Sequence, residues 1–246
     1  MLRLQFLGCG DAFGSGGRFN TCFHLVGHNV NALIDCGASS LVALKRFAVD
    51  TEAIDTILIS HFHADHFGGI PFFMLNAQYV SRRERPLTIA GPPGLQSWYG
   101  RAMECAFPAS SATPPRFALS LRELAISERS ELGALAVTPY HVLHDDRAGP
   151  CLALRIEAEG KVITYSGDTA WTDELIPAAR AADLFVCECY TFERAVKAHT
   201  SFTTLAGHLD TIGARRVVLT HMSADMLAHR HEVPYSIAED GLVIEI

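Results

Sequence analysis

Short apolar runs rich in β-branched residues recur along the chain and predict buried β-strands. The clearest is 54–60, Ile-Asp-Thr-Ile-Leu-Ile-Ser, which a histidine-rich segment follows directly. Turn-forming residues separate the runs, so each run predicts one short strand. The predicted strands span 2–7, 21–26, 31–35, 54–60, 86–90, 135–143, 151–158, 161–166, 183–189, 216–220 and 242–246.

Helical stretches are predicted between these strands. They span 38–48, 69–81, 94–106, 172–182 and 200–213, with a further candidate at 224–231. Two hairpins, at Gly27-His28-Asn29 and Glu159-Gly160, mix with longer crossover connections. The pattern therefore favours a mixed α/β fold, with two sheets covered by helices, over one doubly wound sheet. No linker or repeat divides the 246 residues, so we expect a single domain, 1–246.

A glycine-rich segment, Gly8-Cys-Gly-Asp-Ala-Phe-Gly14, follows the first predicted strand. It resembles a dinucleotide-binding fingerprint. However, Phe13 occupies the place of the third glycine and the next element is predicted as a strand, so the context argues against that motif. The sequence instead predicts a tight turn in which glycine lets the backbone pass close to a neighbouring site.

Charge and cysteine content narrow the class of protein. The formal net charge of −7 argues against stable nucleic-acid binding, and we interpret the densest basic cluster, Arg82-Arg-Glu-Arg85, as a solvated helix end. Seven cysteines, an odd number lying mostly in apolar runs, suit reduced thiols better than a disulfide framework. The first residues lack the apolar length of a signal peptide, and no run is long enough to span a membrane. We therefore expect a cytoplasmic protein with no membrane partner.

The segment His61-Phe-His-Ala-Asp-His66 carries the strongest chemical signal. It places three imidazoles and a carboxylate at the end of a buried strand, where side chains enter a rigid and partly dry site. Neutral imidazole and carboxylate are the ligands that zinc, manganese and iron(II) prefer. We therefore predict two metal sites with two ligands each from this segment: His61 and His63 for one, Asp65 and His66 for the other.

Two ligands for each ion are too few, and further residues of the ligand type end other predicted strands. These residues are His141, His144, Asp168 and His221, with Asp35 at the end of an early strand. Taken singly, each has a structural explanation, since a strand-end aspartate commonly caps a turn. All of them lie at carboxyl ends of predicted strands, as the histidine-rich segment does, so we expect them to converge.

Together these motifs resemble the metallo-β-lactamase superfamily, most closely the ribonuclease Z branch and its relative, the cyclic phosphodiesterase of the phosphonate pathway. The resemblance runs over nearly the whole chain, and the set of motifs is far more specific than any one of them. It rests on His61-x-His-x-Asp-His66, the downstream histidine, Ser166-Gly-Asp-Thr169 and Leu219-Thr-His221, with Leu7-Gly-x-Gly10, Asn20-Thr21, Leu33-Ile-Asp-Cys-Gly37 and Gly91-Pro-Pro-Gly94 in support.

The resemblance implies an αββα sandwich with two divalent cations at one edge between the sheets. Zn²⁺ is the preferred ion, with Mn²⁺ or Fe²⁺ as alternatives. The implied ligands are His61, His63 and His144 for one ion and Asp65, His66 and His221 for the other, with Asp168 bridging. The family's spacing from the Val-Thr-Pro strand start favours His144, and His141 stays as the alternative. Asp35 would orient a ligand imidazole from behind.

The resemblance also implies a hydrolase. Two ions roughly 3.5–4 Å apart share a water and lower its pKa, which gives a metal-bridging hydroxide that attacks a phosphodiester. Glu188 and His199 resemble the pair that delivers a proton to the leaving oxygen in this branch, and Asp65 would steer the proton of the hydroxide as well as ligate. The other interpretation of Glu188 and His199 is a charged strand end and a surface histidine.

Ribonuclease Z grips tRNA with an arm inserted between its third histidine motif and its Ser-Gly-Asp-Thr motif. Here only 24 positions separate His144 from Asp168, and one predicted hairpin fills them. We therefore expect a small or cyclic phosphodiester as substrate. The alternatives are a metallo-hydrolase of a lactone, thioester or other ester, an armless ribonuclease Z-like endoribonuclease, and a non-hydrolytic metal-binding accessory protein. A homodimer is compatible with the sequence, and 107–116 is either a lid over the pocket or a plain surface loop.

Overall fold

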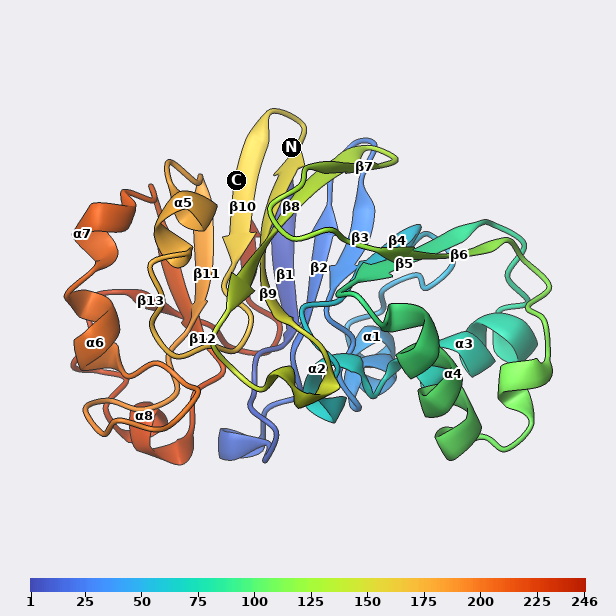
Figure 1. Ribbon diagram of the computed structural model, residues 1–246, viewed down its shortest axis with the longest axis horizontal. Helices are drawn as coiled ribbons and strands as arrows, with labels where there is room; N and C mark the ends of the chain where they lie inside the picture. The colour runs from blue at the N-terminus through green and yellow to red at the C-terminus, as the bar shows by residue number, and fades with distance from the viewer.

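Two seven-stranded sheets form the framework of the protein (Figure 1). The structure, a computed structural model, describes residues 1–246. The first sheet has the strand order β14-β1-β2-β3-β4-β5-β6. Its strands are β1 (Arg3–Gly8), β2 (Cys22–Val26), β3 (Asn31–Ile34), β4 (Thr56–Leu58), β5 (Leu87–Gly91), β6 (Leu119–Glu123) and β14 (Val243–Glu245).

The second sheet has the strand order β13-β12-β11-β10-β9-β8-β7. Its strands are β7 (Ser130–Leu132), β8 (Leu135–Val142), β9 (Cys151–Ala158), β10 (Lys161–Tyr165), β11 (Leu184–Glu188), β12 (Val217–Thr220) and β13 (Ser236–Ile237). The predicted hairpin between β9 and β10 is confirmed. Its turn residues Glu159 (φ 51°) and Gly160 (φ 76°) both have positive φ, as a two-residue hairpin turn of the favoured hand requires.

Each sheet is antiparallel over its first strands and parallel over its last ones. In the first sheet β1, β2 and β3 pair antiparallel, and β3 to β6 pair parallel. In the second sheet β7 to β10 pair antiparallel, and β10 to β13 pair parallel. Because parallel neighbours end at the same edge of a sheet, the segments that follow β3, β4, β10, β11 and β12 can gather functional side chains.

Helices cover the outer face of each sheet. They are α1 (Ser40–Arg46), α2 (Ala64–Phe67), α3 (Ile70–Leu75), α4 (Leu95–Ala106), α5 (Leu175–Ala179), α6 (Phe202–Ala206), α7 (Leu209–Ile212) and α8 (Ala224–Ala228). One core, including Leu4, Phe23 and Ile156, lies between the sheets. Separate clusters pack α1, α3 and α4 on the first sheet and α5 to α8 on the second. This layering confirms the expected αββα sandwich.

The main differences from the predicted elements lie at the sheet edges and at helix breaks. The unpredicted strands β6, β7 and β13 are all edge strands, which are short and carry less of the buried apolar pattern. The predicted helix 200–213 is two helices, α6 and α7, and 69–81 is α3 followed by a π-helical turn at Asn76–Val80.

The basic cluster Arg82-Arg-Glu-Arg85 is not simply a solvated helix end, because Arg83 is buried. Its guanidinium donates hydrogen bonds to the carbonyl oxygens of Thr51 (3.1 Å), Ile54 (2.6 Å) and Pro86 (2.8 Å). Buried carbonyls need such donors, so Arg83 joins two loops that flank β4 and β5.

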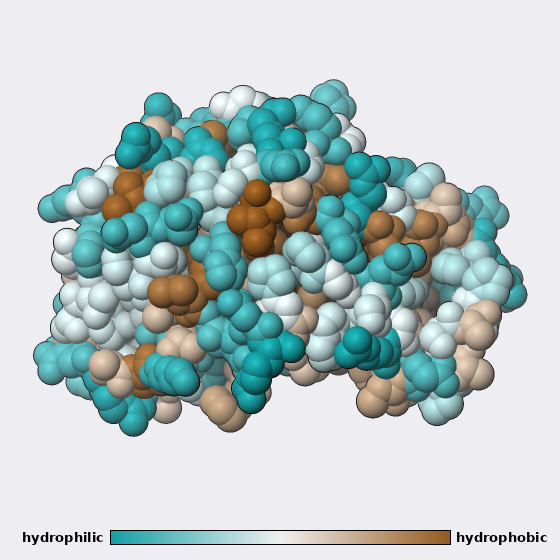
Figure 2. Space-filling view, in the orientation of Figure 1, coloured by the Kyte–Doolittle hydropathy of each residue, from teal (hydrophilic) through white to brown (hydrophobic).

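None of the helices combines the length and apolar content needed to cross a membrane. On the face shown in Figure 2, apolar residues are interspersed among hydrophilic ones and do not form one broad patch. That face therefore offers no large apolar docking surface.

Candidate metal centre

The histidine-rich segment leaves the carboxyl end of β4 and changes conformation within six residues. The chain stays extended as far as His63 (φ −64°, ψ 149°) and then turns into the short helix α2. This change of direction separates the first two histidines from Asp65 and His66. One contiguous motif can thus serve two neighbouring ligand clusters.

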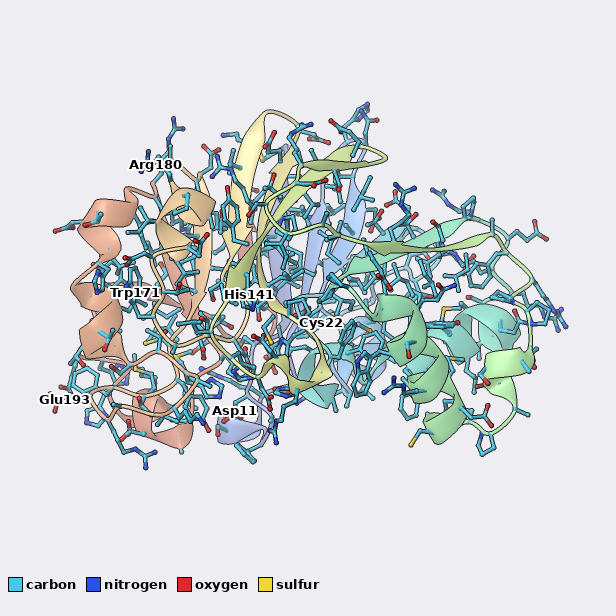
Figure 3. All side chains as sticks on the ribbon, viewed as in Figure 1. Asp11, Cys22, His141, Trp171, Arg180 and Glu193 are labelled. Carbon is cyan, nitrogen blue, oxygen red and sulfur yellow. The ribbon has the colours of Figure 1, made fainter.

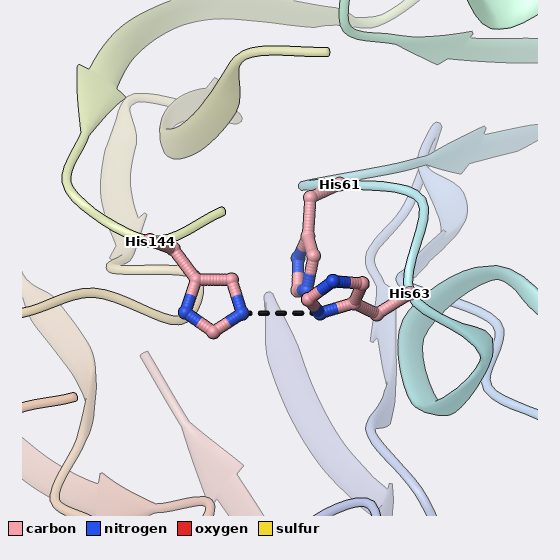
Figure 4. Close-up of side chains that lie close together, drawn as sticks. All are labelled: His61, His63 and His144. Atoms are coloured by element: carbon pink, nitrogen blue, oxygen red, sulfur yellow. Dashed lines mark hydrogen bonds between the residues drawn. The ribbon is translucent and has the colours of Figure 1, made fainter. Parts of the chain in front are cut away.

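The first cluster, here called the histidine cluster, consists of His61, His63 and His144. One ring nitrogen from each lies within 4.8 Å of the others. His63 Nδ1 and His144 Nε2 are 3.1 Å apart, although the two residues are 81 positions apart in the chain (Figure 4). A separation of this size is close to that of two imidazole nitrogens that bind one tetrahedral ion at about 2.0–2.1 Å each.

The second cluster, here called the carboxylate cluster, consists of Asp65, His66, Asp168 and His221, and all four residues are buried. Asp168 Oδ2 lies 3.2 Å from His66 Nε2 and 3.1 Å from His221 Nε2. The same oxygen lies 3.9 Å from both His61 Nε2 and His144 Nε2. Asp168 therefore lies between the two clusters, where a bridging ligand must be.

Unsatisfied buried atoms mark the same place. His61 Nε2, His66 Nε2, Asp168 Oδ1 and His221 Nδ1 are buried and have no hydrogen-bond partner. An unpaired buried polar atom costs about 1–3 kcal/mol, so a group of them at one point indicates that a ligand belongs there. The donor set, imidazoles with carboxylates, fits a pair of divalent transition-metal ions.

The carboxylates remain charged despite their burial. Burial alone would raise the pKa of the Asp168 carboxyl, but the adjacent His221 and His66 lower that pKa well below its ordinary value. Burial likewise opposes the charge of Asp65, and His66 and His221 outweigh it and lower the Asp65 pKa. Both side chains are thus available as anionic ligands at neutral pH.

The outward-facing ring nitrogens of three predicted ligands have protein partners. His66 Nδ1 lies 2.7 Å from Asp35 Oδ2, and Asp35 also accepts hydrogen bonds from the Ser60 amide and hydroxyl, both at 2.7 Å. The Ser60 hydroxyl lies 3.1 Å from His61 Nδ1, and the carbonyl oxygen of Ala198 lies 2.8 Å from His144 Nδ1. Such partners fix ring orientation and tautomer, so Asp35 lies where the sequence placed it.

Two of the converging residues have a left-handed backbone conformation. Asp35 has φ 57° and His221 has φ 56°, and each follows the end of a strand. A non-glycine residue at positive φ costs free energy and is held there by its surroundings. The His221 amide, for example, donates a hydrogen bond to the Cys9 carbonyl (3.1 Å).

His141 lies outside both clusters. Its Nε2 lies 3.1 Å from the Asp146 carboxylate, and His141 itself, on β8, is labelled in Figure 3. The geometry therefore supports His144 as the candidate ligand, as the spacing favoured. Asp145, which follows His144 in the sequence, has its Oδ2 3.8 Å from His63 Nε2. Its carboxylate also accepts a hydrogen bond from the Arg147 guanidinium.

Glu188 and His199 form a pair beside the clusters. Glu188, at the end of β11, is fully buried, accepts a hydrogen bond from the Thr169 amide, and lies 2.9 Å from His199 Nδ1. Burial raises the pKa of the Glu188 carboxyl to about 8. Burial lowers the pKa of His199, but the bond to Glu188 outweighs it and raises that pKa to about 9. The contact with Glu188 thus favours the protonated, cationic form of His199 near neutral pH.

The clusters open into a cavity of about 140 Å³. Its lining residues are Ala12, Phe13, His63, Asp65, His144, Asp168, Tyr190, His199 and His221. No residue of 107–116 is among them. Ser110, Thr113 and Pro115 line a separate small cavity against α3 and α4, so a lid over this pocket is not supported.

The sequence did not single out Phe13 or Tyr190 as residues of the site. Phe13 lies in the glycine-rich turn after β1, which does pass close to the site as expected. Tyr190 follows the β11 strand, and its ring stacks on His199 with centroids 4.4 Å apart. Neither residue is adjacent to a candidate metal ligand in the sequence, so no local signal indicated that they line the cavity.

Comparison with known proteins agrees with this geometry. The chain matches the family model described as anti-Pycsar protein Apyc1 over residues 2–239. It is 30% identical to the uncharacterized protein Rv1339 of Mycobacterium tuberculosis, over 90% of this chain and 81% of that protein. It is 25% identical to a ribonuclease Z of Agathobacter rectalis, over 92% of this chain and 89% of that protein. The metallo-β-lactamase fold protein YhfI of Bacillus subtilis superposes with a TM-score of 0.79 at 20% identity, covering 100% of both chains.

Proposed function

The chain belongs to the family of the anti-Pycsar protein Apyc1, within the metallo-β-lactamase superfamily, and on that premise we propose that it is a dinuclear phosphodiesterase for a small or cyclic phosphodiester. It is a metal-dependent hydrolase. What the proposal adds is the bond that is hydrolysed, the size of the substrate and the roles of individual residues.

The position of Asp168 is the observation that carries the proposal. One carboxylate oxygen within 3.1–3.9 Å of four histidine nitrogens joins the histidine cluster to the carboxylate cluster. In this proposal His61, His63 and His144 hold one ion, Asp65, His66 and His221 hold the other, and Asp168 bridges them. Two divalent ions bound there would supply a nucleophilic water at neutral pH and neutralise charge on the phosphate oxygens.

His199 is the proposed general acid. An alkoxide leaves poorly unless it is protonated, and His199 lines the cavity while Glu188 accepts at its Nδ1, which leaves the Nε2 proton of the imidazolium for the leaving oxygen. The ring of His199 lies 4.9 Å from that of His144 between centroids, so its Nε2 edge can approach a leaving oxygen beside the histidine cluster. Glu188 is a positioning residue that fixes the ring from behind.

Asp65 has a second role in the proposal. Its carboxylate lines the cavity and is kept charged by the neighbouring imidazoles. It can therefore accept a hydrogen bond from the attacking water and so steer its proton, as well as ligate an ion.

The expected substrate is small because nothing replaces the tRNA-binding arm. The β9–β10 hairpin fills the connection between His144 and Asp168, and the strands are only eight and five residues long. A cavity of about 140 Å³ suits a phosphate centre with one bound group at its mouth. We propose Zn²⁺ as the ion, and the cytoplasm as the location because all seven cysteines are free thiols.

The test is a substrate panel on zinc-reconstituted protein, with metal content measured by elemental analysis. Cyclic phosphates, dinucleotides, bis(p-nitrophenyl) phosphate, lactones and thioesters are compared. Two ions per chain and turnover confined to phosphodiesters are the expected results. Turnover of lactones or thioesters alone would support the other hydrolase alternative, and two bound ions with no turnover at all would support an accessory protein.

A further inference from the structure

The turn after β1 carries one large apolar side chain to the mouth of the metal cavity. Phe13 lines that cavity with His63 and His221, yet its side chain is 83% exposed. An isolated exposed phenylalanine is ordinary on a protein surface. An exposed phenylalanine at the rim of a cavity lined mainly by histidines and aspartates needs a specific explanation.

The turn that carries Phe13 is held firmly. The buried Asp11 carboxylate accepts hydrogen bonds from the Phe13 amide (3.2 Å), the Ser15 amide (2.9 Å) and the Ser15 hydroxyl (2.7 Å). Asp11 lies at the lower edge of the molecule in Figure 3, in the segment that follows β1. From the far end of the chain, Asp240 accepts from the Cys9 amide (3.1 Å) and the Phe19 amide (2.8 Å). A side chain on such a turn has a fixed place relative to the cavity.

The turn also packs against the second sheet's helices. Gly16 has φ 71°, and a Cβ there would lie 2.9 Å from Leu227 Cδ1 of α8. The positive φ favours glycine there, and the end of the Leu227 side chain packs close to it. The turn that carries Phe13 is thus packed against α8.

The rest of the cavity wall is matched to a charged centre. Apart from Ala12 and Phe13, its residues are histidines, aspartates and Tyr190. One face of the Tyr190 ring is already covered by His199 at 4.4 Å. No lysine or arginine lines the cavity, so the outer part of a substrate is not recognised there by a cation. Phe13 offers the free aromatic face.

The volume decides which part of the substrate meets Phe13. A cavity of about 140 Å³ would have to hold both ions and the phosphate, and it is smaller than the about 300–1,000 Å³ of pockets that enclose a whole drug-sized ligand. A group esterified to that phosphate must lie at the mouth, where the ring of Phe13 is. We propose that Phe13 is a specificity-determining residue, whose ring stacks on a planar aromatic group carried by the phosphoester substrate. This proposal rests on the proposed function, because it assumes a phosphate at the metal centre.

The test separates the ring from the phosphate. Adenosine 5′-monophosphate and ribose 5-phosphate differ only by the aromatic base, and their dissociation constants are measured by calorimetry on zinc-reconstituted protein. Stacking of a base on an aromatic side chain corresponds to about 5- to 150-fold in affinity. We expect the wild type to prefer the adenosine compound by at least about fivefold. In Phe13→Ala that preference should fall to near parity, while ribose 5-phosphate binds as before.

Two further variants keep the result specific. Phe13→Trp should retain the preference, since it keeps a planar ring. Phe72→Ala is the matched control, because Phe72 is also exposed, at 45%, but lies on α3 and does not line the cavity. A preference unchanged in Phe13→Ala, or equal binding of both compounds by the wild type, overturns the proposal. So does loss of a dimer in Phe13→Ala on size-exclusion chromatography, since Phe13 would then cover a second copy.

The failure of this inference can be told from the failure of the proposed function. Calorimetry measures binding whether or not the protein turns over a diester. A wild type that binds both phosphates with the expected preference but hydrolyses no phosphodiester would leave Phe13 as a recognition residue and remove the proposed reaction.

Discussion

The two ligand clusters lie side by side but differ in burial and in charge. The histidine cluster contains no carboxylate, and two of its three residues, His63 and His144, are only partly buried. The carboxylate cluster is buried throughout and contains Asp65 and Asp168. Attraction between a divalent cation and a carboxylate grows as the local dielectric falls. The two sites are therefore not equivalent, and the carboxylate cluster should hold its ion more tightly.

The residues behind the ligands repeat the same contrast. In the carboxylate cluster the fully buried Asp35 lies 2.7 Å from His66 Nδ1. In the histidine cluster the outer nitrogen of His63 faces Asp145, at 3.8 Å, near solvent. The buried carboxylate is thus within hydrogen-bond distance of its histidine, whereas the carboxylate near solvent is not. Variants of Asp35 and of Asp145 can test this difference.

Asp168→Ala should have the largest effect because it removes the residue shared by both clusters. Loss of metal-based stabilisation of the transition state amounts to several kcal/mol, so hydrolysis of bis(p-nitrophenyl) phosphate should fall on the order of 10³-fold or more. Elemental analysis should show fewer than two zinc ions per chain, with circular dichroism unchanged.

Asp146→Ala is the matched control for that variant, since Asp146 pairs with His141 outside both clusters. It should keep both ions and its activity. An Asp168→Ala protein that retains two ions and wild-type turnover would show that the clusters do not share this carboxylate.

His199→Ala should have the next largest effect, and only for poor leaving groups. A general acid typically contributes about 10²-fold or more, so cleavage of a diester with an alkyl leaving group should slow by about that factor. A p-nitrophenolate leaves without protonation, so bis(p-nitrophenyl) phosphate should be hydrolysed at nearly the wild-type rate. Steady-state kinetics on both substrates measure the ratio, with His141→Ala as the control. Equal losses on the two substrates would count against His199 as the acid.

Asp35→Asn should weaken one ion and spare the other. Loss of a partner behind a ligand histidine typically lowers metal affinity about 10- to 100-fold. Because Asp35 contacts His66 directly and reaches His61 only through the Ser60 hydroxyl, titration with a chelator should show the larger change for the tighter of the two ions. A uniform loss at both ions would mean that the two clusters bind metal as one unit and do not differ in affinity as proposed.

The sequence could predict those parts of the site that lie close together in the chain. Four candidate ligands could be predicted because they lie within six residues, from His61 to His66, at the end of a clearly predicted strand. The choice of His144 over His141 depended on resemblance, and only the fold shows that His141 turns outward to Asp146. Edge strands such as β6 were missed because partial burial leaves a weak apolar pattern.

Other features of the site were not readable because they depend on contacts between distant segments. Asp240 secures the turn that carries Phe13 from more than two hundred positions away. The separation of Phe13 and Tyr190 in the sequence gives no sign that both line one cavity. Local motifs fix ligand identity, whereas the walls of the cavity follow from how the two sheets pack.

Asp145→Ala should have the smallest effect, and it completes the comparison with Asp35. Asp145 is partly exposed, its carboxylate is already bonded to Arg147, and it lies 3.8 Å from His63 Nε2, too far for a firm hydrogen bond. Pairs that solvent screens contribute little, so the affinity of the more weakly held ion should fall by less than about fivefold. Chelator titration of Asp145→Ala beside Asp35→Asn and Asp146→Ala measures the three effects on one scale. A loss at Asp145 as large as that at Asp35 would mean that binding of the ion draws Asp145 onto His63, and that burial alone does not set the strength of the carboxylate behind each ligand.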